Sequence, residues 1–185
     1  MSSDRRRMLI TISGLPGSGK TTVARLVARE LGLEHVYAGE IFRRQAQERG
    51  IPLADYLRMA ETDESIDRQL DAQMLERAAA GGAVLEGRLT AYIAEKAGVP
   101  ALKVFLDASE QVRAERIAGR EGGATAERLR EIQAREASDR SRYLALYGVD
   151  YHDRGRYDLV MATDSQTPEE LARAIVRECR ARFPG

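Results

Sequence analysis

The segment at residues 14–22, GLPGSGKTT, contains the residues best suited to chemistry in this chain. It matches the pattern G-x-x-x-x-G-K-[ST], in which the backbone curls so that its N–H groups point at phosphate oxygens. Lys20 would reach the outer phosphates, and Thr21 would offer its hydroxyl to Mg²⁺, partly through water. We therefore expect this phosphate loop to bind ATP with Mg²⁺ as the cofactor. The expected ATP-binding residues are Gly14, Leu15, Pro16, Gly17, Ser18, Gly19, Lys20, Thr21 and Thr22.

Two arginines follow predicted strands and form a second candidate group. Arg43 lies one turn into a predicted helix after the strand at 34–39, and Arg88 directly follows Gly87 after the strand at 83–86. Lysine occurs only at positions 20, 96 and 103, so nearly all of the 29 basic residues are arginines and a single arginine carries little information. Two arginines at strand exits favour a site for a second anion, because ligands bind at the carboxyl ends of parallel strands.

Hydrophobic periodicity predicts the elements that would position these residues. Strands are expected at 8–13, 34–39, 83–86, 102–107 and 157–162. Helices are expected at 20–31, 40–49, 52–60, 63–80, 109–120 and 125–147, with a last one starting at 167–168. Ser109, Thr125 and Thr167 are the expected helix caps. The alternating order predicts one α/β domain over 1–185, with a five-stranded parallel sheet covered by helices on both faces.

Composition limits the classes of partner. The formal net charge of +0 argues against a large basic surface for duplex nucleic acid. No apolar run is long enough to span a membrane, and the N-terminal segment does not resemble a signal peptide. The single cysteine excludes an internal disulfide and a cysteine-rich zinc site. We expect a cytoplasmic monomer that binds small molecules and neither nucleic acid nor membrane, with residues 1–7 as an extension before Met8.

The phosphate loop alone does not identify the reaction. A switch GTPase would need a base-reading Asn-Lys-x-Asp segment, which the sequence lacks, and a large ATPase would exceed 185 residues. Paired helices between the second and third strands, at about 39–80, are typical of a small kinase whose acceptor pocket they form. A P-loop kinase fold with a helical acceptor-binding insert is therefore the expected architecture.

Four segments resemble those of nucleoside monophosphate kinases, and their sequences are most similar to those of the short, archaeal-type cytidylate kinases. They are ITISGLPGSGKTTVA (10–24), AGEIFR (38–43), VLEGRL (84–89) and RYLALYGVD (142–150), and the resemblance extends from about Met8 to Ala174. Adenylate kinases carry Asp where this chain has Glu40 and Glu86, and here Arg88 follows Gly87 directly. This departure disfavours an adenine acceptor.

The resemblance implies roles for further residues. Arg43 and Arg88 would hold the acceptor nucleotide, chiefly its phosphate. The segment at 135–142 is similar to an Arg-x-x-x-Asp-x-x-Arg element, which would add contacts to the acceptor. A short lid at about 116–128 would carry catalytic arginines beside Lys20. The residues carried over in this way are the acceptor residues Arg43, Arg88, Arg135, Asp139 and Arg142, and the lid arginines Arg116 and Arg120.

The expected activity is therefore that of a cytidylate kinase, which transfers the γ-phosphate of ATP-Mg²⁺ to CMP and also to dCMP. The alternatives are a kinase for AMP, UMP or shikimate, and a nucleotide-binding regulatory module without phosphoryl transfer. Asp63, Asp67 and Asp71 are interpreted as a solvated acidic face, with the last two as weaker candidates for positioning acceptor arginines. His35 and His152 are interpreted as structural, and Asp107 and Asp158 as local hydrogen-bonding groups.

Overall fold

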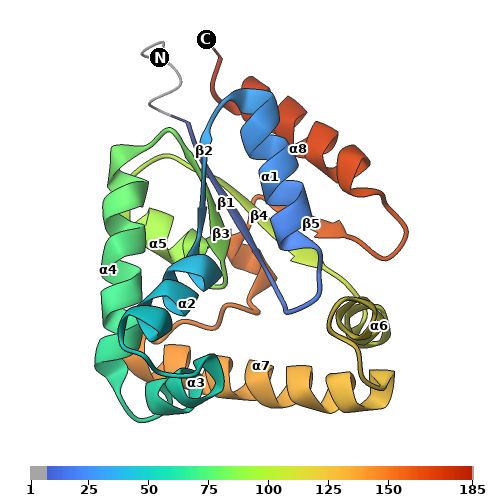
Figure 1. Ribbon diagram of the computed structural model, residues 1–185. Coiled ribbons are helices and arrows are strands. Elements are labelled where there is room, and N and C mark those ends of the chain that lie inside the picture. Colours follow the sequence, from blue (N-terminus) through green and yellow to red (C-terminus); the bar gives the residue numbers. More distant parts are fainter. Residues whose placement is uncertain (1–7, 185) are drawn as a thin grey trace.

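The computed structural model describes residues 8–184. Within them, five strands form one sheet in the order β2-β3-β1-β4-β5, and every neighbouring pair is parallel. The expected parallel sheet is confirmed, and Figure 1 shows the helices that connect its strands. The strands are β1 Leu9–Gly14, β2 Glu34–Tyr37, β3 Ala83–Gly87, β4 Leu102–Asp107 and β5 Leu159–Ala162.

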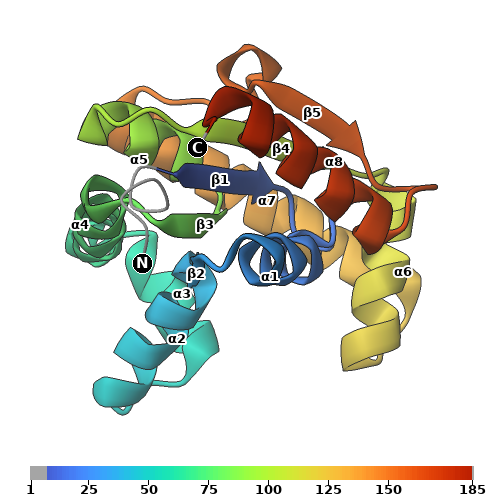
Figure 2. The ribbon, with the colours of Figure 1, turned by 90° about the horizontal axis from the view of Figure 1, so that it is seen from above.

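Helices cover both faces of the sheet, as the alternating pattern predicts. They are α1 Lys20–Leu31, α2 Ala38–Glu48, α3 Leu53–Ala60, α4 Glu64–Ala80, α5 Thr90–Ala97, α6 Glu110–Glu121, α7 Thr125–Tyr147 and α8 Pro168–Arg182, with a 3₁₀ turn η2 at Arg154–Arg156. Figure 2 shows α1 and α8 side by side on one face. None of the helices in residues 8–184 has the length and apolar character needed to cross a membrane.

The core has two layers because β1 is buried on both faces. Ile10 and Ile12 pack against α1 and α8, whereas Leu9 packs with side chains of α4, α5 and α7. This alternation follows from the two-residue period of a strand. Two covered faces leave the carboxyl end of the sheet as the place where the loops can form a site.

Several element boundaries differ from the expected ones, and α5 at Thr90–Ala97 was not among the expected helices. β2 ends at Tyr37 because Ala38 and Gly39 already belong to α2. β5 starts at Leu159 because Tyr157 still caps the 3₁₀ turn η2. Thr125 is not a cap: Ala124 occupies the N-cap position of α7 without a side-chain hydrogen bond. The expected caps at Ser109 and Thr167 are confirmed. The expected extension at 1–7 lies outside the described residues.

Candidate active site

The phosphate loop connects the end of β1 to the first turn of α1, as its motif requires. Gly17 has a φ of +80°, and a Cβ built on it would lie 2.7 Å from the backbone oxygen of Arg113. A side chain is therefore excluded there by both conformation and space. The N-terminus of α1 directs unpaired backbone N–H groups and the positive end of the helix dipole at this loop, an arrangement suited to phosphate.

Lys20 is held over this loop by a backbone contact. Its Nζ donates to the backbone oxygen of Leu15 at 2.7 Å. Burial and, after it, the positive charge of Arg88 lower the pKa of Lys20, while Glu86 acts in the opposite direction, and the net result is a pKa of about 7. Negative phosphates in the loop would stabilise the protonated ammonium.

Thr21 lies in a hydrogen-bonded group with Glu86 and His35. Its hydroxyl donates to Oε1 of Glu86 at 2.6 Å, and Nε2 of His35 lies 2.9 Å from the other carboxylate oxygen. Glu86 is 1% exposed. This arrangement leaves the lone pairs of the Thr21 hydroxyl for Mg²⁺, so the residues present fit the metal. Among the described residues no group of three or more His, Cys, Asp or Glu forms a metal cage, as is usual for Mg²⁺ bound largely by substrate phosphates and water.

One cavity of about 820 Å³ contains nearly all of the residues that the sequence indicates. Its lining brings residues 16–22 of the phosphate loop together with side chains from α2, the β3 exit, α6 and α7. Gly14 and Leu15, at the start of the loop, do not line the cavity. The predicted residues that face this cavity outside the loop are Arg43, Arg88, Arg116, Arg120, Arg135, Asp139 and Arg142.

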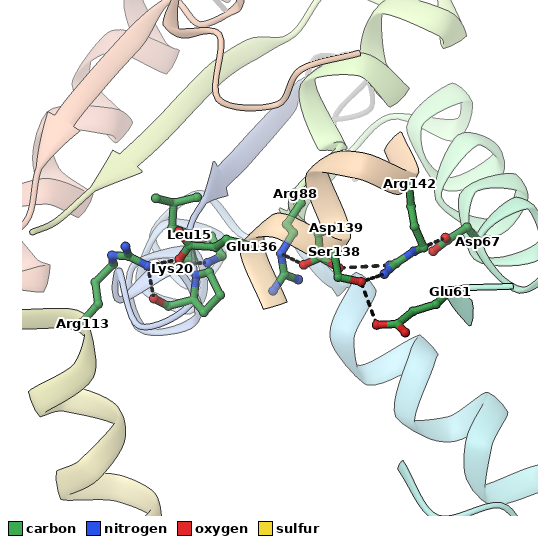
Figure 3. Close-up of polar contacts among 11 residues, drawn as sticks. Leu15, Lys20, Glu61, Asp67, Arg88, Arg113, Glu136, Ser138, Asp139 and Arg142 are labelled. Atoms are coloured by element: carbon green, nitrogen blue, oxygen red, sulfur yellow. Dashed lines mark hydrogen bonds and ion pairs between the residues drawn. The ribbon is translucent and has the colours of Figure 1, made fainter. Parts of the chain in front are cut away.

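Buried ion pairs fix the predicted acceptor residues. Nε of Arg88 lies 2.6 Å from Oδ2 of Asp139, in an ion pair without a directional hydrogen bond between those two atoms. Arg142 donates from Nε to Asp67 at 2.9 Å and from a terminal nitrogen to Asp139 at 3.0 Å. Figure 3 shows these contacts together at the end of the site farther from Lys20. Burial opposes the charge of Arg88, but Asp139 and nearby tyrosines stabilise it, and the net effect raises its pKa.

The remaining arginines are exposed toward the cavity. Arg43 lies over the ring of Tyr37, with 5.0 Å between the guanidinium carbon and the ring centroid. The pKa of Arg135 is lowered, chiefly by the positive charge of Arg88. Several like charges in one cavity repel one another, so the site is suited to a ligand with multiple negative charges.

The two lid arginines differ in how they are held. Arg116 donates to Oγ1 of Thr163 at 2.9 Å and to the backbone oxygen of the same residue at 2.6 Å. Arg120 is exposed and pairs only with its neighbour Glu121. Thr163 lies just after β5 and was not among the expected site residues; no motif in the sequence marks it.

The acidic face expected on α4 is wrong at Asp67, which is 2% exposed and paired with Arg142. Asp71 is half-buried beside the cavity, and burial raises its pKa to about 6. The sequence contains a signal for the burial of Asp67 and Asp71, because both share a helix face with Leu70 and Met74 at spacings of three and four residues. Asp63 instead caps α4 by accepting from the backbone of Ser65.

The remaining interpretations concern residues that do not line the cavity. Asp107 pairs with Arg154 and Asp158 accepts from the backbone of Lys103, so both are local hydrogen-bonding groups as expected. His35 does not line the cavity and contacts Glu86 beside Thr21, which agrees with the expected structural role. Arg113, on the same helix as the lid arginines, is buried and does not line the cavity.

Known structures resemble the fold. An uncharacterized protein from Eubacterium ventriosum aligns with a TM-score of 0.71 at 15% identity, over 95% of this chain and 99% of its own. A shikimate kinase from Acinetobacter baumannii in complex with shikimate aligns with a TM-score of 0.61 at 18% identity, over 96% and 95%. A gluconokinase from Sinorhizobium meliloti gives 0.62 at 20% identity, over 97% and 95%. At these identities the likeness shows a shared P-loop kinase fold.

Comparison of sequences finds relatives with higher identity to this chain than the structures above. The chain is 45% identical over 171 residues to a cytidylate kinase of Pyrococcus horikoshii, covering 92% of this chain and 87% of the relative. It is 45% identical over 170 residues to a cytidylate kinase of Methanopyrus kandleri, covering 88% of each. The family model for the cytidylate kinase-like family matches residues 9–165. The chain therefore belongs to the cytidylate kinase-like family.

Proposed function

We propose that this protein is a cytidylate kinase that transfers the γ-phosphoryl group of ATP to CMP and to dCMP. The bond from the γ-phosphorus to the bridging oxygen of ATP breaks, and a bond to an oxygen of the acceptor phosphate forms, giving ADP and the cytidine diphosphate. The single observation that carries the proposal is one cavity with a phosphate loop on one side and arginines from separate elements on the other. The curated relatives named above are cytidylate kinases, which supports the choice of acceptor.

The phosphate loop would hold the donor. Its backbone N–H groups and the N-terminus of α1 face the β- and γ-phosphates, and Lys20 releases its contact with Leu15 to reach them. Thr21, oriented by Glu86, would hold Mg²⁺. When bound there, the metal would neutralise charge on the donor phosphates.

The acceptor residues would hold the phosphate of CMP in line with the γ-phosphate. Arg88 is already fixed by Asp139, so little side-chain freedom remains to be lost on binding. Holding both substrates in line supplies most of the catalysis in phosphoryl transfer, and the loose transition state does not need a strong general base. Arg43 and Arg135 are exposed to the same cavity and would complete the acceptor site.

The lid arginines would stabilise the group in transfer. Arg116 and Arg120 lie four residues apart at the end of α6, and both face the cavity. The turn that follows contains Gly122 and Gly123 with φ of +78° and +85°, a conformation that glycine adopts without strain. We assign a lid to about 116–128 and the acceptor-binding helices to about 39–80 within a single domain. We propose that the protein acts as a monomer, because one chain supplies both the phosphate loop and the acceptor arginines.

A coupled ADP-release assay with CMP, dCMP, UMP, AMP and shikimate tests this proposal. We expect turnover with CMP and dCMP at a higher kcat/KM than with the other acceptors. Absence of turnover with all five would overturn the kinase assignment in favour of a regulatory module. A tenfold preference for AMP over CMP would overturn only the identity of the acceptor.

A further inference from the structure

Arg113 connects three parts of the molecule from a fully buried position. It is 1% exposed and is the largest of the fully buried side chains among the described residues. Its Nε donates to the backbone oxygen of Ala108 at 3.1 Å, and a terminal nitrogen donates to the backbone oxygen of Pro16 at 3.2 Å. The same nitrogen forms an ion pair with Glu136 of α7. Figure 3 shows Arg113 reaching toward the phosphate loop from α6.

Neither Arg113 nor Glu136 lines the cavity, so neither side chain can touch a substrate bound there. The residues next to them do line it. Pro16 and Gly17 face the cavity from the phosphate loop, and Gly17 packs directly against the backbone of Arg113. The pair therefore lies one layer behind the reacting groups.

Helix α7, which carries Glu136, forms two more buried ion pairs on the acceptor side of the cavity. Glu136, Asp139 and Arg142 follow one another at three-residue spacing on α7, which places them along one side of the helix. Glu136 pairs toward the phosphate loop, Asp139 pairs with Arg88 at the β3 exit, and Arg142 pairs with Asp67 on α4. Figure 1 shows α7 running from α6 past the carboxyl end of the sheet to the α3–α4 side.

We propose that Arg113 and Glu136 are positioning residues that fix the phosphate loop at a set distance from the acceptor residues of α7. This inference rests on the proposed kinase function. Phosphoryl transfer depends on the in-line separation of two bound phosphates, and a misplacement of about 1 Å can cost about 100-fold in rate. A buried ion pair contributes little net stability compared with apolar side chains of similar size, so stability alone does not account for it.

Two variants separate positioning from folding. Glu136→Gln removes the charge and keeps the shape, and the double variant Arg113→Met/Glu136→Leu replaces the whole pair with apolar side chains. We expect kcat to fall about 10- to 100-fold in both, because the ion pair that ties the loop to α7 is lost and Glu136→Gln can replace it only with a weaker hydrogen bond. The KM values for ATP and CMP should stay within about threefold, since no substrate contact is lost. Arg140→Met, which removes a surface pair between this residue of α7 and Asp150 in the turn after the helix, should leave all three constants unchanged.

A second measurement reports the link without turnover. ATP binding at the loop should slow amide hydrogen exchange in the middle of α7, around residues 132–140, in the wild-type protein. Glu136→Gln should lose this protection while ATP still binds. The same protection in both proteins, or a kcat within twofold of wild type in folded Glu136→Gln, would overturn the inference. If the double variant does not fold, Glu136→Gln alone decides.

Failure of the two proposals is distinguishable. Absence of CMP turnover in the wild-type protein contradicts the proposed function, and the exchange measurement still tests the link. CMP turnover that is unchanged by Glu136→Gln contradicts only the positioning role. A tenfold rise in one KM at constant kcat also contradicts it, because such a change indicates a direct substrate contact.

Discussion

The two sides of the cavity are built in different ways. The phosphate loop is one run of consecutive residues whose shape is set by glycines and by the helix that follows. The acceptor side is assembled from α2, the β3 exit, α4 and α7, and its side chains are fixed by pairs such as Arg142 with Asp67, which are 75 positions apart. Local backbone geometry therefore supports one side and tertiary ion pairing the other. Substitutions on the two sides should accordingly fail in different ways.

The largest effect is expected on the acceptor side, from Arg88→Met. The change removes a proposed phosphate ligand and leaves Asp139 buried without its partner, and breaking a buried pair costs about 3–5 kcal/mol. We expect kcat/KM for CMP to fall by about 10³-fold or more, while the dissociation constant for ATP stays within about twofold. Steady-state kinetics and calorimetric titration with ATP measure the two quantities.

A matched control for Arg88→Met is Arg180→Met, which removes an exposed pair between α8 and Glu30 of α1, neither of which lines the cavity. It should leave kcat/KM for CMP within about threefold of wild type. Equal losses of ATP and CMP affinity in Arg88→Met would show that this arginine serves the donor, and the two sides would then not be separable as described.

A second, smaller effect should come from the pair that anchors α7 to α4. Asp67→Asn and Arg142→Met should each raise the KM for CMP by about 10- to 30-fold, because each leaves a partly buried charge without its partner. In the double variant the two losses should not add, since both remove the same contact. A double-mutant cycle on kcat/KM measures this coupling, and strict additivity would argue against the pair as a working unit.

The phosphate loop should respond to a change in backbone shape. Gly17→Ala forces a Cβ against Arg113 at a φ of +80°, which we expect to lower the free energy of unfolding by about 1–3 kcal/mol and to weaken ATP binding. Gly119→Ala is the control, because it lies within α6 with no atom within 4 Å of the added Cβ; it should raise stability by about 0.4–1 kcal/mol. Urea denaturation with and without ATP tests both, and unchanged ATP affinity in Gly17→Ala would contradict the close fit of the loop.

The same contrast explains which parts of the site the sequence predicts. The phosphate loop is a local motif, so its position and neighbouring elements follow from the residues themselves. Arg43 and Arg88 could be placed at the sheet edge because strand exits are also local features. Arg113 could not, because whether a helical arginine is buried depends on Glu136, 23 positions further along the chain. Asp67 was misassigned for a related reason: four-residue spacing indicates a face, but only packing against α7 decides that the face is buried.

The smallest expected effect concerns the protonation of Lys20, which depends on residues from both sides of the cavity. Because the pKa of Lys20 is lowered from 10.5 to about 7, the unfolded chain binds more protons than the folded one between these values. The free protein should therefore gain stability as pH rises from about 7 toward 10.5, and the cost of the buried charge is fully present below pH 7. ATP supplies negative charge that raises the pKa again, so ATP binding at pH 8 should take up a fraction of one proton.

Arg88 is the largest single charge that lowers the pKa of Lys20, after burial itself. Its removal in Arg88→Met should therefore let Lys20 keep its proton in the free protein and reduce the uptake on ATP binding at pH 8. Calorimetric titration in two buffers of different ionisation enthalpy measures the uptake, and the difference between the two proteins cancels the protons exchanged by ATP itself. An unchanged uptake would mean that the charge of the donor lysine is set within the loop alone. A reduced uptake with unchanged ATP affinity would mean that an acceptor residue tunes the donor site through charge and leaves the shape of the loop unaltered.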